Sequence, residues 1–316
     1  MEDIIAPVPK ELLKAELTVD KRLRFTRRSD NEIYVVTAHE APNVMREIGR
    51  LREIAFRAAG GGTGKDVDID EYDTMEVPYK QLIVWNPENY DIMGGYRFIY
   101  GSDMRYDENG MPMIATAHGM FRFSDKFMKD YLPYTVELGR AFVALEYQST
   151  RMGSKSLFAL DNLWDGLGAL AVVLPGMKYY FGKVTMYPSY PVDARNVILY
   201  FLREQFPDKD KLVEPIEPLV PGGDETAFKS LFCYDNYKDN YYALKQEVQK
   251  SGVAIPPMVS AYMGLSATMR IFGTAINYGF GNVEETGLLI AVDELLEEKR
   301  KRYIESFINS NPDAVK

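Results

Sequence analysis

The chain of 316 residues contains very little of the two side chains that build most zinc centres. Its single cysteine, Cys233, excludes an internal disulfide and a cysteine-rich metal site. The two histidines, His39 and His118, lie far apart in the sequence, so a zinc site would need carboxylate ligands in addition. We therefore expect no bound metal and interpret both histidines as ordinary polar positions.

Long apolar runs are also missing. The most apolar window, residues 167–174, ends at Pro175 and is far shorter than the roughly 20 residues that a membrane-spanning helix requires. The N-terminus is acidic and is soon interrupted by Pro7 and Pro9, which does not fit a signal peptide. We expect a cytoplasmic protein, for which peripheral contact with the inner face of a membrane stays open.

An excess of positive charge is absent as well. The net charge is −9 and the pI is about 5.0, which argues against nucleic acid as the main partner. Hydrophobic residues make up 46% of the chain and charged residues 26%, as in an ordinary globular protein with a sizeable core.

Strand patterns and helix patterns are mixed along the chain, which predicts an α/β (α+β) fold. Segments rich in β-branched and aromatic residues predict strands, and two of these flank a turn at residues 86–89 to form a hairpin. The predicted strands are residues 33–37, 82–85, 92–100, 135–146 and 179–186. The predicted helices are residues 42–59, 154–173, 192–205, 225–251 and 294–308.

Residues 206–223 differ in character from the rest, with four prolines and little periodicity. This composition predicts an excursion from the core, followed by the tyrosine-rich helical residues 225–251. Because the strands that follow have no core of their own, we predict one domain over residues 1–316 with residues 206–251 as an insertion.

The segment Gly60-Gly-Gly-Thr-Gly64 invites comparison with a phosphate-binding loop. Such a loop joins a strand to a following helix, whereas these glycines follow a predicted helix, so we interpret them as a flexible exit loop. No Gly-x-Ser-x-Gly motif occurs, and Cys233 has no evident histidine partner. Nucleophilic catalysis therefore has little support.

The segment Glu137-Leu-Gly-Arg140 lies within a predicted strand. Alternate residues of a strand share a face, so Glu137 and Arg140 point to opposite sides unless the strand contains a β-bulge. Gly139 is a residue type that permits such a bulge. A bulge at a reaction site can leave a backbone N–H available to polarise a carbonyl group.

Six charged residues stand out because they are distributed over separate predicted elements. They are Arg52, Asp70, Asp73, Arg97, Glu137 and Arg140. If these elements converge, the charges must pair, since isolated buried ions are very costly. A structural ion-pair network and an active site both fit this pattern.

These residues belong to a series of motifs that resembles the ornithine-lipid type of N-acyltransferase. That type belongs to the Gcn5-related (GNAT) superfamily, includes proteins labelled as hemolysins, and is close in fold to acyl-homoserine-lactone synthases. The likeness covers residues 33–205 and 252–300. The motifs, in chain order, are Leu51-Arg52 with Phe56, Asp70-Glu-Tyr-Asp73, Leu82-Ile-Val84 with Gly95-Tyr96-Arg97, Glu137-Leu-Gly-Arg140, Leu163-Trp164-Asp-Gly166 with Tyr179-Tyr-Phe-Gly182, and Pro256-Pro-Met with Tyr262 and Phe280-Gly281.

The resemblance implies a GNAT-like mixed central sheet flanked by helices, with an inserted helical segment. It implies transfer of a long acyl chain, including the 3-hydroxyacyl form, to the amine of an amino acid, with glycine or ornithine as the acceptor. The product is then an aminolipid such as a glycine lipid or an ornithine lipid. The donor is acyl carrier protein, which presents the chain on phosphopantetheine, or acyl-CoA, and no cofactor stays bound.

Roles for individual residues follow from this chemistry. An ammonium group is not a nucleophile, so a base must remove a proton before the amine attacks the thioester, and Glu137 is the candidate, directly or through a water. Main-chain N–H groups near Gly139 would hold the oxyanion. Arg97 and Arg140 would bind the acceptor carboxylate bidentately. The remaining predicted acceptor-site residues are Arg52, Phe56, Asp70 and Asp73.

The donor-binding segment departs from the pattern of relatives that use coenzyme A. Their Gln/Arg-x-x-Gly-x-Gly/Ala cradle corresponds to residues 148–154, where Arg151 replaces the first glycine. This departure is tolerable for a donor without a nucleotide, and Arg151, Gly153 and Ser154 are the predicted donor-binding residues. Carrier proteins are acidic, so basic residues are predicted to dock them. These are Lys126, Lys129, Arg151, Lys155, Lys178 and Lys183.

Two alternatives remain at this point. A lactone synthase that uses S-adenosylmethionine has the same fold, but the N-terminal tryptophans expected around its donor pocket are not evident, since Trp85 and Trp164 are the only two tryptophans. A non-catalytic protein that binds acyl chains or carrier protein would keep the fold without the chemistry.

Overall fold

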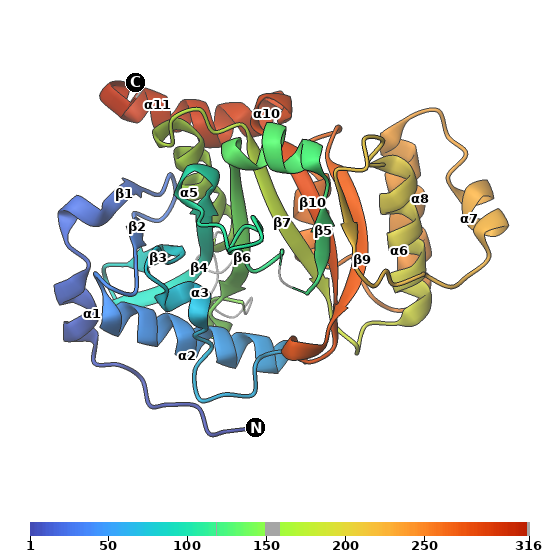
Figure 1. Ribbon diagram of the computed structural model, residues 1–316. Helices are drawn as coiled ribbons and strands as arrows, with labels where there is room; N and C mark the ends of the chain where they lie inside the picture. Colours follow the sequence, from blue (N-terminus) through green and yellow to red (C-terminus); the bar gives the residue numbers. More distant parts are fainter. Residues whose placement is uncertain (118, 149–158, 315–316) are drawn as a thin grey trace.

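The computed structural model describes residues 1–117, 119–148 and 159–314 (Figure 1). Its eight-stranded sheet has the order β1-β2-β3-β4-β6-β7-β10-β9, and a second sheet pairs β5 with β8. The strands are β1 Arg22–Phe25, β2 Glu32–Val36, β3 Lys80–Asn86, β4 Asp91–Tyr100, β5 Phe121–Phe123, β6 Thr135–Val143, β7 Tyr179–Met186, β8 Val213–Pro215, β9 Arg270–Asn277 and β10 Val283–Ala291. The helices are α1 Lys10–Glu16, α2 Pro42–Ala59, α3 Glu71–Thr74, α5 Ala159–Val173, α6 Val192–Gln205, α7 Glu225–Leu231, α8 Tyr237–Lys250, α9 Pro257–Met263, α10 Glu297–Arg300 and α11 Ser306–Ser310.

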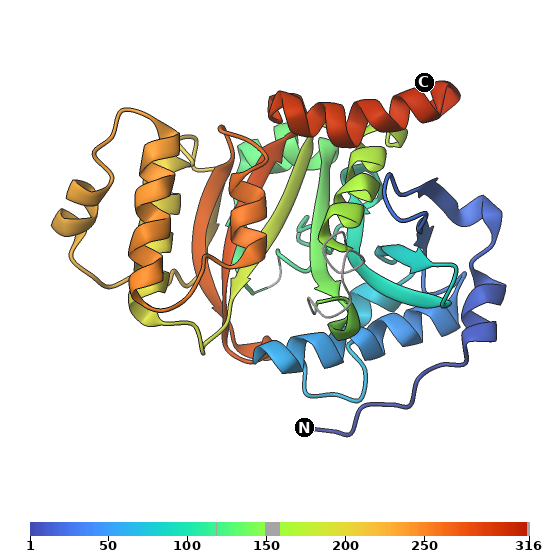
Figure 2. The ribbon, with the colours of Figure 1, turned by 180° about the vertical axis from the view of Figure 1, so that it is seen from behind.

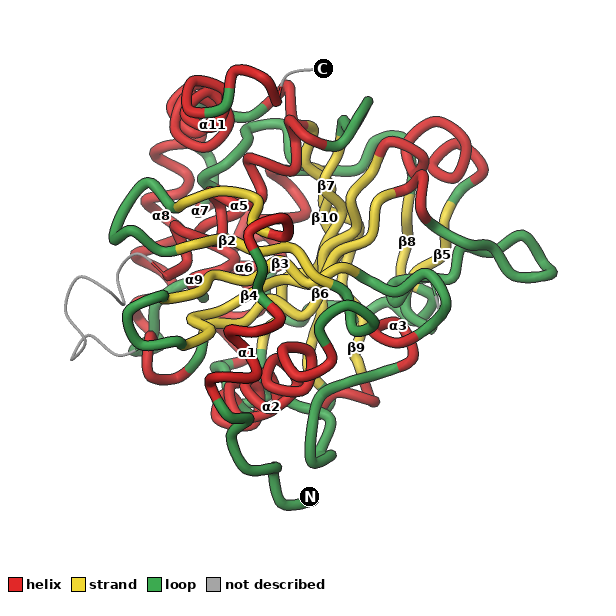
Figure 3. Tube along the Cα trace, turned by 90° about the vertical axis from the view of Figure 1, so that its left-hand side faces the viewer, coloured by secondary structure: helices red, strands yellow, loops and turns green. Residues whose placement is uncertain are grey.

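The residues of each strand alternate between two hydrophobic layers, as the pleat requires. Leu82 and Val84 of β3 belong to the larger core cluster, which includes residues of α5, α6, α8 and α9. Ile83 and Trp85 face the other way and pack with residues of α2. Seen from behind, α5 and α9 lie over the sheet, while α10 and α11 run along one edge of it (Figure 2). In the side view, α3, β5 and β8 lie on the opposite side from α5, α8 and α9 (Figure 3).

The central pair of strands, β6 and β7, is parallel, whereas their neighbours pair antiparallel. The parallel register contains three pairs, which end at Glu137 opposite Phe181. Strand β6 nevertheless continues to Val143 and β7 continues to Met186. The two strands therefore part in the middle of the sheet, immediately after Glu137.

Most of the predicted elements are confirmed, with differences in their bounds. The hairpin of β3 and β4 is present, and β3 begins at Lys80. Strand β6 ends at Val143, earlier than predicted, and Leu145–Tyr147 form a short 3₁₀ helix in place of its predicted end. The predicted C-terminal helix is divided by a π-helical turn, and residues 225–251 form two helices rather than one.

The expectation that residues 206–223 leave the core is wrong for several of them. Leu212 and Val213 are buried in the layer that includes β5, and β8 pairs with β5. Farther along, Leu244 and Val248 of α8 are fully buried in the larger core cluster. The prolines of this segment prevent long regular elements, yet its apolar residues still have enough sheet surface to pack against.

Within the described ranges, no helix is both long and apolar enough to cross a membrane.

Candidate active site

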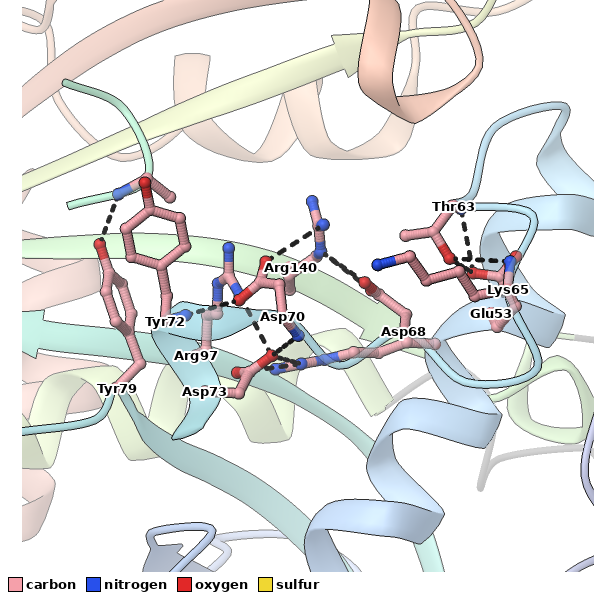
Figure 4. A network of polar contacts seen from close by, with 12 residues as sticks. Glu53, Thr63, Lys65, Asp68, Asp70, Tyr72, Asp73, Tyr79, Arg97 and Arg140 are labelled. Carbon is pink, nitrogen blue, oxygen red and sulfur yellow. Dashed lines mark hydrogen bonds and ion pairs between the residues drawn. The ribbon is translucent and has the colours of Figure 1, made fainter. Parts of the chain in front are cut away.

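Three arginines and three aspartates from separate elements form one buried network (Figure 4). Arg52 of α2 is fully buried; its Nη1 lies 3.4 Å from both carboxylate oxygens of Asp73, and its Nη2 donates to the Gln81 side chain. Arg97 of β4 donates from Nη1 to Asp70 at 2.7 Å and to Asp73 at 3.2 Å. Asp73 therefore joins a helix arginine to a strand arginine.

Arg140 of β6 extends this network to one side. Its Nε lies 2.9 Å from a carboxylate oxygen of Asp68, which is fully buried, and its Nη2 lies 3.5 Å from Asp70. Asp70 is thus shared by Arg97 and Arg140. The three positive and three negative charges balance, which is what allows this network to be buried.

The aspartates are held in place by local backbone contacts. Asp70 is the N-cap of α3, where its carboxylate accepts the Tyr72 N–H, while the carboxylate of Asp73 accepts the Asp70 N–H. This reciprocal arrangement is a capping box, and it fixes both carboxylates before they meet an arginine. The spacing Asp70-x-x-Asp73 is therefore required by the short helix as well as by the network.

The network changes the protonation behaviour of its members. Burial by itself raises the pKa of Asp73, but Arg52 and Arg97 outweigh it and hold the pKa at about 2. Burial lowers the pKa of Arg97, and Asp73 and Asp70 more than restore it, so the pKa of Arg97 is raised. Arg52 differs, since its burial outweighs Asp73 and lowers its pKa.

A β-bulge places Arg140 in this network. Tyr96 of β4 faces two residues of β6, Arg140 and Ala141, because the register shifts by one residue between Gly139 and Phe142. The bulge predicted near Gly139 is thus present one residue later, and the left-handed backbone belongs to Arg140, with φ of 49°. That conformation is unfavourable for a residue with a Cβ and is held here by the ion pairs and the neighbouring strand.

Two phenylalanines support the guanidinium of Arg140. It lies 4.3 Å from the ring centre of Phe280, and Phe280 makes an edge contact with Phe56 at 5.0 Å between ring centres. Phe56, which was predicted at the acceptor site, packs against Phe280, the ring that lies beside the Arg140 guanidinium.

Glu137 lies on the same face of the sheet as Arg97. Arg97 pairs with Gly139 and Ile99 pairs with Glu137 in the register of β4 and β6, so both charged side chains project to one side. The Glu137 carboxylate is buried and accepts a hydrogen bond from the hydroxyl of Tyr79. Burial raises the pKa of Glu137, and Tyr79 and Arg97 partly counteract this effect.

Other polar groups surround Glu137. The hydroxyl of Thr116, a fully buried residue, lies beside the carboxylate and lowers its pKa, yet makes no hydrogen bond of normal geometry among the described residues. From β7, the Lys183 ammonium also attracts Glu137, while it pairs with the buried Glu285 of β10. A carboxylate of raised pKa surrounded by fixed charges is typical of catalytic groups.

The structure thus brings together all six of the charged residues that the sequence singled out, but it also contains partners that sequence reasoning did not assign to this network. These are Asp68, Tyr79, Gln81, Thr116, Lys183, Phe280 and Glu285. Lys183 had been predicted to dock a carrier protein, and Phe280 belonged to a motif without an assigned role. The alternation of Asp66, Asp68 and Asp70 was a signal for the first of them. The predicted donor-binding residues Arg151, Gly153 and Ser154 lie outside the described residues.

The basic residues predicted to dock a carrier protein have different surroundings. Lys129 and Lys178 are exposed, and Lys178 lies over the Tyr134 ring. Lys126 is exposed but pairs with Asp210. Lys183 is not on the surface, because its side chain is largely buried against Glu285. Arg151 and Lys155 lie outside the described residues.

The glycine-rich loop after α2 is occupied by the protein itself. The Glu53 carboxylate accepts hydrogen bonds from the backbone N–H and the hydroxyl of Thr63 (Figure 4). It also accepts the backbone N–H of Gly64 and the Arg57 guanidinium. A phosphate has no place there while this carboxylate fills the loop. The structure therefore supports the interpretation against a phosphate-binding loop.

A small apolar cavity lies on the other face of the sheet, among residues that include Trp164, Tyr180, Tyr262 and Tyr303. Its volume is about 20 Å³, which is room for roughly one water. It is too small for an acyl chain in this conformation. In the described part of the chain, no cluster of histidine, cysteine and carboxylate side chains is arranged to hold a metal ion.

This fold and this site define an acyltransferase of the GNAT class, with a mixed sheet whose two central parallel strands part beside a buried glutamate. An acetyltransferase (GNAT) domain family matches residues 51–156, a range that includes the arginine–aspartate network and Glu137.

Two curated relatives are similar over the whole chain. A glycine N(alpha)-acyltransferase of Phocaeicola vulgatus is 66% identical over 316 residues, covering 100% of this chain and 97% of the relative. A protein of the same name from Bacteroides thetaiotaomicron is also 66% identical over 316 residues, covering 100% of this chain and 94% of the relative. The chain belongs to the family of these acyltransferases.

Solved structures show a weaker likeness. A CoA-dependent acyl-homoserine lactone synthase, BjaI, with S-adenosylmethionine and isopentyl-CoA has a TM-score of 0.37 at 11% identity and covers 89% of each chain. The same synthase with MTA has a TM-score of 0.36 at 9% identity, again over 89% of each chain. A likeness this weak supports no statement about substrates.

Proposed function

We propose that this acyltransferase moves a long acyl chain, including the 3-hydroxyacyl form, from acyl carrier protein to the amine of glycine in the synthesis of an aminolipid. The observation that carries the proposal is the position of Glu137 and the arginine–aspartate network at the point where β6 and β7 part. The names of the two curated relatives support glycine as the acceptor.

Two guanidinium nitrogens of the network are candidates for binding one more carboxylate. In the described part of the chain, neither Nη2 of Arg97 nor Nη1 of Arg140 donates a hydrogen bond. One nitrogen of each guanidinium points to the same side, away from the aspartates (Figure 4). A carboxylate that bridges the two would receive charge-assisted hydrogen bonds of the kind that guanidinium groups form most readily.

Glycine fits the charge balance of this network. As a zwitterion it brings one negative and one positive charge, so its binding leaves the balance of three arginines and three aspartates unchanged. Its carboxylate would lie on Arg97 and Arg140, and its ammonium would face Glu137 or Asp70. Asp70 is the most exposed carboxylate of the network, with 25% of its side chain accessible, so it can meet a ligand from solvent.

The chemistry then has three steps. Glu137 accepts a proton from the glycine ammonium, directly or through a water, and the neutral amine attacks the thioester carbon. The carbonyl oxygen becomes an oxyanion, which a main-chain N–H of the bulge at Arg140 and Ala141 would stabilise, since a bulge removes one residue from the regular ladder. The C–S bond breaks, the attacking nitrogen gives up its second proton, the thiolate leaves and takes up a proton, and the amide remains.

The parted strands suit an extended donor. After Glu137 and Phe181, the facing edges of β6 and β7 no longer pair with each other, so their N–H and C=O groups can bond to the amides of a phosphopantetheine arm. Exposed Lys129 and Lys178 are candidates for contact with an acidic carrier protein.

We propose that the enzyme acts in the cytoplasm. Because its product carries a long acyl chain, we also propose that the enzyme contacts the inner face of the membrane peripherally.

The direct test is an assay of the purified protein with a long-chain acyl carrier protein, and separately with the matching acyl-CoA. Each donor is offered with glycine, ornithine, serine or alanine, and the products are identified by mass spectrometry. We expect N-acyl glycine, formed faster from the carrier protein. If product forms with ornithine alone, the acceptor is ornithine and not glycine. If acyl-CoA is turned over faster than acyl carrier protein, the donor is acyl-CoA. If no pair of donor and acceptor gives an amide, the proposal is overturned.

A further inference from the structure

Tyr79 is a buried tyrosine between the two halves of the site. It lies immediately before β3 and has no exposed surface. Its ring lies against the guanidinium of Arg97, 5.1 Å from that group to the ring centre, and its hydroxyl donates to a carboxylate oxygen of Glu137. One side chain therefore contacts both the arginine proposed to bind the acceptor carboxylate and the base proposed to take the acceptor proton.

The hydroxyl of Tyr79 has a fixed direction. It accepts the backbone N–H of Ala115 at 3.0 Å, and this contact occupies an oxygen lone pair. The hydroxyl proton is then left to point at Oε2 of Glu137. Burial and the nearby Glu137 carboxylate both raise the pKa of Tyr79 well above its ordinary value, so the phenol stays protonated as a donor at neutral pH.

A glutamate side chain has several rotatable bonds, and a base must meet its proton at hydrogen-bond distance. The bond from Tyr79 holds Oε2, so Oε1 is the oxygen that would accept the proton of the amine. Thr116 marks where that proton can arrive. Its hydroxyl lies beside the carboxylate and is buried without a normal hydrogen bond among the described residues, an arrangement that suits a water or an amine.

We propose that Tyr79 is the positioning residue that orients Glu137 toward the acceptor amine, through the chain of contacts from the Ala115 N–H to the Tyr79 hydroxyl to Oε2 of Glu137. This inference rests on the proposed function, because it assumes that Glu137 acts as the base. Tyr79 itself exchanges no proton with the substrate. Its ring also ties this orientation to Arg97, so the carboxylate end and the amine end of the acceptor are held by one side chain.

The test replaces Tyr79 by phenylalanine, which keeps the ring under Arg97 and removes only the hydroxyl. We expect kcat to fall by about 10-fold to 10²-fold, as expected for a slightly misplaced base, while KM for glycine stays within about twofold. Removing a hydrogen bond that favours the ionised carboxylate should also move the acid limb of the kcat profile to higher pH.

The matched control is Tyr180→Phe. Tyr180 is another buried tyrosine, and its hydroxyl donates to the Leu167 carbonyl on the other face of the sheet. Its loss should lower stability without moving the pH profile. If Tyr79→Phe and Tyr180→Phe change rate and profile alike, Tyr79 has only a structural role and the inference fails.

A second measurement does not depend on turnover. Titration of the Glu137 carboxyl by NMR, in protein with ¹³C-labelled glutamate side chains and assigned with Glu137→Gln, should show a higher pKa for Glu137 in Tyr79→Phe than in the wild type. An unchanged titration would overturn the positioning role even if the enzyme acylates glycine. A shifted titration without acylation of glycine would uphold the contact and reject the proposed function instead.

Discussion

Arg97 and Gly139 lie opposite each other in the register of β4 and β6, with Ile99 opposite Glu137 one pair farther along. The guanidinium proposed to bind the acceptor and the proposed base are therefore neighbours on one face of the sheet. A Cβ at Gly139 would lie 3.4 Å from Arg97 Nε, which is an ordinary contact distance, so the Arg97 side chain packs directly over this position of β6. This pairing is the geometric basis of the proposed acyl-transfer site.

Replacement of Glu137 by glutamine should separate function from stability. We expect the rate of transfer to fall by ~10²-fold or more, because the amide cannot accept the amine proton. Stability at neutral pH should stay equal or rise, since the variant no longer buries a charge at a position where burial raises the pKa. Initial rates and thermal unfolding measure the two effects.

The control is Glu146→Gln, which changes an exposed glutamate just beyond β6. A Glu137→Gln enzyme of normal rate would assign the base elsewhere.

The pH dependence of kcat should report the base in its buried setting. The ionised carboxylate is the active form, and burial raises the pKa of Glu137 above its ordinary value of 4.5. Activity should therefore increase with pH along an acid limb whose midpoint lies above 4.5. Rates at saturating glycine from pH 4 to pH 9 measure this limb. A midpoint at or below 4.5 would contradict the assignment.

Asp73→Asn should destabilise the protein by about 3–5 kcal/mol, because two buried arginines lose a shared counter-charge. The pKa of Asp73 is about 2 against an ordinary 3.8, so its stabilising effect is present above about pH 4 and is lost as the pH falls toward 2. Urea unfolding of wild type and variant from pH 3 to pH 7 tests both points. Glu71→Gln, exposed on the same short helix, should have little effect. Equal losses of stability in Asp73→Asn and Glu71→Gln would show that Asp73 has no special role in the network.

Arg140→Gln should weaken acceptor binding more than it slows the chemical step. The variant keeps a polar side chain, although a shorter one, and removes the charge proposed to meet the glycine carboxylate. We expect KM for glycine to rise about 10-fold or more, the effect of losing a charge-assisted contact of about 1.5–3 kcal/mol. Because Asp68 loses its partner as well, circular dichroism should first confirm that the variant is folded.

The control is Arg46→Gln, which changes an exposed arginine of α2. An unchanged KM would show that the carboxylate binds elsewhere.

The sequence predicted the parts of the site that have a local signature. The hairpin of β3 and β4 follows from alternation and turn residues, and the bulge follows from a glycine beside charged residues in a strand. The pairing of Arg52, Asp73 and Arg97 was predicted from a physical constraint on the condition that their elements converge, because buried charges must pair.

Other contacts left no local signature. Tyr79 is one of 22 tyrosines, and its bond to Glu137 spans 58 residues of sequence. Phe280 supports Arg140 across an even longer separation, and its motif in the sequence does not indicate this contact. The bulge predicted near Gly139 is present, but the left-handed backbone belongs to Arg140, whose ion pairs hold that conformation.

The most direct measurement is a crystal structure of the protein with glycine and an unreactive thioether analogue of the long-chain donor. The glycine carboxylate should lie between Nη2 of Arg97 and Nη1 of Arg140, with its nitrogen at hydrogen-bond distance from Glu137 or one water away, and the thioether between β6 and β7. Glycine bound away from these arginines, or with its nitrogen directed away from Glu137, would contradict the account.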